Sequence, residues 1–176
     1  MITPPETPVT VTGPFDLFAP LPSGPTTTVL EASAGTGKTY ALAALVTRYV
    51  AEGAALLDDM LLITFSRAAS QELRERVRDQ LVRAAEALDD PTRADDALLT
   101  HLVTGTDAEL AGRRRNLRDA LAGFDAATIA TTHQFCQLVL RSLGVAGDTD
   151  AGVTLVENLD DLVTEVVDDL YLQRFG

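Results

Sequence analysis

Residues 32–39 of the chain read ASAGTGKT and stand between a short apolar stretch and a helical pattern. Gly35 and Gly37 allow the backbone to turn with its N–H groups aimed inward, which creates a site for an anion. Lys38 is the only lysine, since the other thirteen of the fourteen lysines and arginines are arginine. A compact ammonium on a flexible stem suits the oxygens of a terminal phosphate. The segment therefore predicts a phosphate-binding loop made of Ala32, Ser33, Ala34, Gly35, Thr36, Gly37, Lys38 and Thr39.

The loop residues predict ATP with Mg²⁺ as the ligand. Lys38 is expected to contact the β and γ phosphates, and the hydroxyl of Thr39 to bind Mg²⁺. The first glycine that is usual in such loops is Ala32 here. Two alternatives remain, a glycine-rich turn without a ligand and a small phosphotransferase. A phosphotransferase would need an arginine-rich lid, and the acidic segment 148–169 does not provide one.

Strands that alternate with helices predict a parallel α/β fold. Short strands are expected at 28–32, 61–65 and 127–131, the second of them buried, with helices between and after them. The helices are expected at 38–52, 67–88, 95–103, 107–122, 132–143 and 158–174, and Ser66 is expected to cap the second. The predicted parts are an arm at 1–27, a nucleotide-binding domain at 28–144 and a helical part from 145 to 176.

Composition sets limits on the class of protein. A chain of 176 residues with 46% hydrophobic residues can form one domain with a real core. No apolar run is long enough to span a membrane, and the N-terminus lacks the pattern of a signal peptide. The net charge of −12 argues against a protein that coats nucleic acid, although arginines gather at 67–83 and 113–118. A single cysteine, Cys136, fits a reducing cytoplasm.

Three segments in this order resemble the motifs of the UvrD/Rep-like superfamily 1 DNA helicases, in the RecB branch. They are residues 30–39 (LEASAGTGKT), 61–74 (LLITFSRAASQELR) and 128–136 (TIATTHQFC), preceded by Phe15-Asp16-Leu17 near the N-terminus. The resemblance runs from about residue 15 to residue 143. As a set the motifs are specific, whereas each of the later two alone would be weak.

The resemblance implies the fold and the function. The fold would be a RecA-like P-loop NTPase sheet flanked by helices, that is, an incomplete motor domain 1A followed by the start of a helical 1B insertion. The function would be ATP binding in the N-terminal part of an ATP-dependent DNA helicase and exonuclease subunit that acts in recombinational repair of double-strand breaks. Its partners would be single- and double-stranded DNA ends and subunits of the RecC and RecD types, in the cytoplasm.

The resemblance also implies DNA contacts at Thr64, Phe65, Ser66, Thr132 and His133. Hydroxyl groups can donate to phosphate, and an aromatic ring can stack on a base. The alternative for Phe65 is a core aromatic residue at the end of a strand. The alternative for Thr132 and His133 is a capping threonine beside a structural histidine.

Four other side chains receive simpler interpretations. Arg67 could face DNA or solvent, and Arg74 is expected on the solvated side of its helix. His101 is expected at the surface, and Cys136 is expected to be a buried thiol beside Leu140.

Helicases of this family carry an acidic pair after an apolar strand, which holds Mg²⁺ and activates water, and this chain has no such pair. Asp160-Asp161 and Asp168-Asp169 lie in a helical pattern and are rejected for this role. Arginine fingers, a second motor domain and a nuclease domain are also missing. The chain alone is therefore expected to bind ATP without hydrolysing it, as a non-catalytic nucleotide-binding or assembly module.

Overall fold

The computed structural model describes residues 13–22, 27–33 and 35–143, together with the single helical positions Val163, Val166, Val167, Leu170 and Arg174. The chain divides into two compact units, residues 1–131 and 132–176, which are described separately. Apart from those single positions, the helix expected at 158–174 and the helical part expected from 145 lie outside the described residues.

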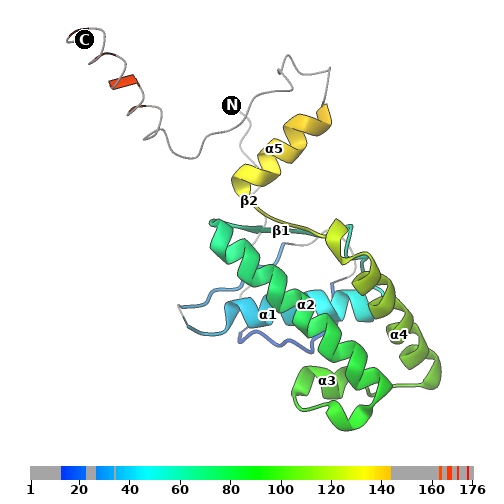
Figure 1. Cartoon of the computed structure of the whole chain (residues 1–176). Coiled ribbons are helices and arrows are strands. Elements are labelled where there is room, and N and C mark those ends of the chain that lie inside the picture. Colours follow the sequence, from blue (N-terminus) through cyan, green and yellow to red (C-terminus); the bar gives the residue numbers. More distant parts are fainter. Residues whose placement is uncertain are drawn as a thin grey trace, which may run out of the picture. The chain divides into compact units, whose positions relative to one another are not determined.

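The first unit contains four α-helices, two short 3₁₀ helices and two strands in its described residues (Figure 1). In chain order they are α1 (Lys38–Ala51), β1 (Leu61–Thr64), α2 (Arg67–Asp89), η1 (Pro91–Arg93), α3 (Ala97–Leu102), α4 (Asp107–Ala122), η2 (Phe124–Ala126) and β2 (Thr128–Thr131). The described part of the second unit is mainly α5 (Thr132–Leu143). These bounds confirm the expected helices to within a few residues.

Side-chain caps explain why α2, α3 and α4 begin where they do. The side chains of Ser66, Asp96 and Thr106 each accept a hydrogen bond from a backbone N–H in the first turn of the helix that follows. Thr106 and Glu109 also form a reciprocal capping box. Each cap satisfies an N–H that has no partner inside the helix. The expectation that Ser66 caps the long helix is therefore confirmed.

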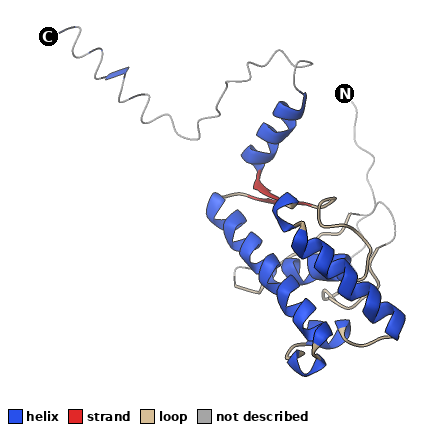
Figure 2. Cartoon of the chain, turned by 45° about the vertical axis from the view of Figure 1, so that its right-hand side comes forward, coloured by secondary structure: helices blue, strands red, loops and turns tan. Residues whose placement is uncertain are grey.

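The two strands pair in parallel, with Leu61 opposite Thr128 and Thr64 opposite Thr131 (Figure 2). Parallel pairing across intervening helices confirms the α/β class. The expectation that β1 is buried is wrong, because Leu61 and Ile63 are each 43% exposed. Side chains alternate between the two faces of a strand, and only the face that carries Leu62 packs on the core.

No strand forms at 28–32, which corrects the sequence-based expectation. Residues 27–33 have no regular secondary structure, and Val29 is 80% exposed. An apolar run predicts that a segment can pair, but a strand forms only where another strand supplies hydrogen-bond partners. Within the described residues, β1 and β2 pair only with each other.

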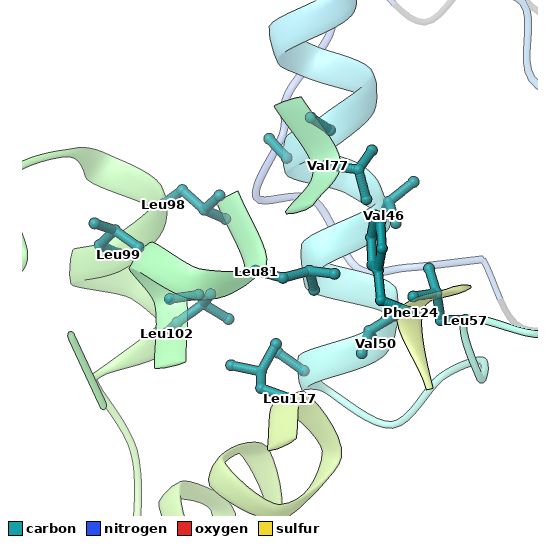
Figure 3. Packing of buried hydrophobic residues seen from close by; sticks show 14 of the residues in the cluster. Val46, Val50, Leu57, Val77, Leu81, Leu98, Leu99, Leu102, Leu117 and Phe124 are labelled. Carbon is teal, nitrogen blue, oxygen red and sulfur yellow. The ribbon is translucent and has the colours of Figure 1, made fainter. Parts of the chain in front are cut away.

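The core of the first unit lies between α1, α2, α3 and α4 (Figure 3). The apolar residues that α2 contributes to this core recur every three or four positions, at Leu73, Val77, Leu81, Ala84 and Leu88. α2 also contacts both strands, so one helix links the helical core to the sheet. α1 packs on α2, α4 and α3, and this packing holds it in place.

Residues 17–19 of the arm contact the helical core. Leu17 lies against the core, and the ring of Phe18 stands 5.4 Å from the ring of His101 in α3. The guanidinium of Arg48, only 3% exposed, donates to the carbonyl oxygens of Leu17 and Ala19. A buried cation in α1 thus binds the backbone of the arm.

Candidate functional site

The loop before α1 has the backbone that its glycines predict. Gly35 has a φ of 76° and Gly37 a φ of 85°, both in the left-handed region that side-chain-bearing residues rarely adopt. Gly37 is also the residue from which α1 starts. The turn therefore requires glycine at these two positions, and it leads directly into the helix.

The ammonium of Lys38 lies against its own loop. Its Nζ donates to the carbonyl oxygen of Ala32 at 3.0 Å and to that of Ser33 at 2.6 Å. The hydroxyl of Thr36 donates to the same Ser33 carbonyl at 2.8 Å. Both partners of the lysine are neutral oxygens of exposed residues, and an anionic oxygen makes a stronger hydrogen bond with an ammonium. A phosphate that approaches this loop would therefore compete well for Lys38.

The start of α1 differs from the starts of α2, α3 and α4. Gly37 provides no side-chain cap, whereas each of the other three helices has one. The first N–H groups of a helix have no intrahelical acceptor, and the helix dipole makes that end positive. Loop, lysine and open helix end together fit a phosphate group. The half-buried Thr39 follows in the first turn of the helix.

Thr64 and Ser66 lie together where β1 passes into α2. The Thr64 hydroxyl is 2.7 Å from that of Ser70, and Ser66 Oγ accepts from the Ala69 N–H at 3.1 Å. The Ser66 hydroxyl can still donate its own proton, because its role as a cap uses only a lone pair. Both side chains therefore hold the start of α2 and could also meet a phosphate.

Phe65 is 100% exposed. The alternative that it is a core aromatic residue is therefore wrong in this structure. A fully exposed ring between two hydroxyl-bearing residues is a suitable surface for stacking on a base.

Thr132 and His133 begin α5 directly after β2, and both are exposed. Both belong to the second unit, whereas Thr64, Phe65 and Ser66 belong to the first. The structure thus brings together the three residues of the β1–α2 junction. A shared face that also includes Thr132 and His133 stays a prediction.

Several residues have roles that the sequence did not reveal. Arg74 is not on a solvated face: it donates to the Ala127 carbonyl at 3.0 Å, and its guanidinium carbon lies 5.7 Å from the centre of the Phe124 ring. It therefore ties α2 to the chain that enters β2. Cys136 is exposed, which corrects the expectation of a buried thiol.

His101 is not a simple surface residue either. Its Nε2 lies 3.0 Å from Glu52 Oε1, and Arg48 donates to both oxygens of the same carboxylate. Burial opposes ionisation of Glu52, but the hydrogen bonds from Arg48 and His101 outweigh this effect and lower its pKa. A signal was present in the sequence, because Arg48 stands at helical spacing from Ala44 and Ala51 on the apolar face, with Glu52 one turn later.

Several known proteins are similar to this chain. The family model described as UvrD/REP helicase N-terminal domain matches residues 19–174. RecBCD enzyme subunit RecB of Mycolicibacterium smegmatis is 75% identical over 92% of this chain and 15% of its own length. The RecB protein of Mycobacterium tuberculosis is 67% identical over the same shares. An ATP-dependent helicase/nuclease protein of Clostridium perfringens is 26% identical over 81% of this chain and 10% of its own length. The chain thus spans about 15% of the length of the RecB proteins that it matches at high identity.

Proposed function

The chain belongs to the UvrD/REP helicase N-terminal domain family, and from this premise we propose that its residues 32–39 bind ATP together with Mg²⁺. The observation that carries the proposal is the open start of α1, where Gly37 leaves the helix without a side-chain cap beside Lys38. Such an end concentrates unsatisfied N–H groups and positive potential at one point, which is the environment a phosphate chain needs.

Each residue has a specific part in this site. The N–H groups of residues 33–39 surround the phosphates, and Lys38 leaves the carbonyls of Ala32 and Ser33 to contact the terminal phosphate oxygens. Thr39 supplies one oxygen ligand to Mg²⁺. When bound, Mg²⁺ neutralises part of the phosphate charge, and the chain's own residues orient the nucleotide at the helix end.

Single-stranded DNA is the proposed second ligand. Thr64 and Ser66 would donate to backbone phosphates while Phe65 stacks on a base, and Thr132 and His133 would contact the strand from the start of α5. The exposure of the Phe65 ring supports this assignment. Ligands of α/β folds bind at the ends of parallel strands, and Thr64 ends β1.

We place this chain in the N-terminal part of a RecB-type subunit of an ATP-dependent DNA helicase and exonuclease. The names of the matched relatives support this placement. The subunit would work on DNA ends in the recombinational repair of double-strand breaks, in the cytoplasm, with subunits of the RecC and RecD types. Among the described residues no helix is long and apolar enough to cross a membrane.

Titration of ATP with Mg²⁺ into the purified 176-residue chain tests the nucleotide site. The Lys38→Ala variant should lose binding by at least about a hundredfold, because its ammonium is the side chain that meets the phosphates. Far-UV circular dichroism and the thermal midpoint should stay unchanged, since Lys38 is exposed and bonds only to its own loop. Arg76→Ala, which removes a surface ion pair on α2, is the matched control and should bind normally. Equal affinity in the wild type and Lys38→Ala would overturn the assignment.

A further inference from the structure

A hollow lies at the end of α1 that is opposite the phosphate loop. It has a volume of about 360 Å³ and is formed by the last turn of α1, the loop 53–58, the second half of α4 and η2. α1 has fourteen residues, so this hollow is about 20 Å along the helix from Lys38. It is therefore separate from the proposed nucleotide site.

Most of the lining is apolar. Val50 and Leu57 form part of it and are buried next to the core (Figure 3), while Leu56 stands at its edge and is 64% exposed. Ala120 contributes from α4. A surface of this kind can accept an aliphatic side chain and remove it from water.

The charged groups in the lining are all acidic. They are the carboxylates of Asp58 and Asp119, and among the described residues neither has a hydrogen-bond or ion-pair partner. Several carboxylates elsewhere in the first unit are paired, among them Glu52 with Arg48, Asp89 with Arg118 and Asp95 with Arg83. The hollow therefore combines an apolar floor with two unneutralised negative charges.

Arginine has the chemistry that complements this combination. Its three methylene groups can pack on an apolar surface while its guanidinium stays at the rim, where it can donate two parallel hydrogen bonds to a carboxylate. The same charges would repel the phosphates of DNA, so nucleic acid is a poor occupant. We propose that this hollow is the docking site for an arginine side chain presented by a segment of a partner protein.

Solution NMR of the 176-residue chain with two tripeptides tests the proposal. One is acetyl-Ala-Arg-Leu-amide, and the other contains citrulline, which has the shape of arginine without its charge. The arginine peptide should shift the amide signals of Gly53 and Gly123, which line the hollow, and leave those of Gly35 and Gly37 unchanged. The citrulline peptide should bind about tenfold more weakly, the loss expected for two exposed ion pairs.

Two variants separate charge from shape. The double variant Asp58→Asn with Asp119→Asn should lower the affinity for the arginine peptide about tenfold, and Ala120→Leu should lower it by filling the hollow. Asp79→Asn, which removes an exposed carboxylate from α2, is the matched control and should bind like the wild type. ATP with Mg²⁺ should shift Gly37 and not Gly123, so a failure of this proposal is distinguishable from a failure of the nucleotide site.

Three results would overturn the proposal. The first is equal affinity for the arginine and citrulline peptides. The second is displacement of the arginine peptide by spermidine at the same concentration as by unlabelled arginine peptide. The third is wild-type affinity for the arginine peptide in both the Asn double variant and Ala120→Leu. The second result would show a site for polyamines instead of a partner protein.

Discussion

The first turn of α2 is capped by a side chain, whereas the first turn of α1 is not. Both helices have N–H groups in their first turn that lack intrahelical partners. At α2 the side chain of Ser66 satisfies the Ala69 N–H, whereas at α1 Gly37 satisfies none and Lys38 stands beside the open end. A capped start stabilises the helix, and an open start with a cation beside it is available to an anionic ligand. The comparison teaches that a missing cap can mark a binding site.

The largest expected effect concerns catalysis at the open start of α1. Purified residues 1–176 should turn over ATP at least about 10³-fold more slowly than a complete motor of this family, because groups that stabilise the transition state contribute factors of that size. Thr64 and Thr131 end the two described strands, and no carboxylate follows either of them directly. A phosphate-release assay with Lys38→Ala as the blank measures this rate. Rapid ATP turnover that disappears in Lys38→Ala would show that the chain hydrolyses ATP by itself and does not only bind it.

Replacement of Phe65, which precedes α2, tests whether its exposed ring stacks on a DNA base. Phe65→Ala should lower the affinity for single-stranded DNA about tenfold, since stacking of one base on an aromatic ring contributes about 1–3 kcal/mol. Fluorescence anisotropy with a short oligothymidine measures the change, and affinity in both proteins should fall as salt is raised. Val82→Ala on the same helix is the control and should leave binding unchanged. An unaltered affinity in Phe65→Ala would remove this ring from the DNA contact.

Gly37→Ala should distort the turn from which α1 starts. A methyl group meets no atom within 4 Å, but the φ of 85° is unfavourable for alanine by about 1–2 kcal/mol. The loop should relax and the affinity for ATP with Mg²⁺ should fall about tenfold. Gly112→Ala is the matched control, because this glycine lies inside α4 with open space around it and without a positive φ. Its ATP affinity should stay constant while helix stability rises.

The smallest expected effect is at the capped start of α2. Ser66→Ala should lower the free energy of unfolding by about 1 kcal/mol and leave ATP affinity unchanged, because it removes one N-cap. Chemical denaturation of both proteins measures the difference. Ser66→Asp should restore stability, since aspartate also caps, yet weaken DNA binding through its negative charge. A cap variant that weakened ATP binding instead would mean that the two helix starts are coupled.

The caps and the helix ends can be predicted from the sequence because they depend on neighbouring residues. Ser66 and the capping box of Thr106 and Glu109 act within one turn of the chain. The positive φ at Gly35 and Gly37 is equally local, and so the turn at these two glycines is predictable from the sequence. The spacing of Leu73, Val77 and Leu81 predicts the buried face of α2 without knowledge of its neighbours.

Sequence patterns mislead where a residue's environment is supplied by a distant segment. Local pattern places Arg74 in solvent because its partner, the Ala127 carbonyl, lies 53 residues later in the chain. It places His101 at the surface, although Glu52 and Phe18 reach it from α1 and the arm. The apolar run at 28–32 suggests a strand, which needs a neighbouring strand that local pattern does not provide.

The sequence by itself determined the helices α1 to α5, the cap at Ser66, the glycine turn before α1 and the family, since each depends on residues that are close in the chain or on a motif order. Only the tertiary structure decided that Arg48 binds the arm, that Phe65 is fully exposed and that Asp58 and Asp119 line one hollow. The physical reason is that burial and pairing depend on which segments meet in space. A residue's own type and its near neighbours fix its conformational preferences, whereas its partners come from packing across the whole unit.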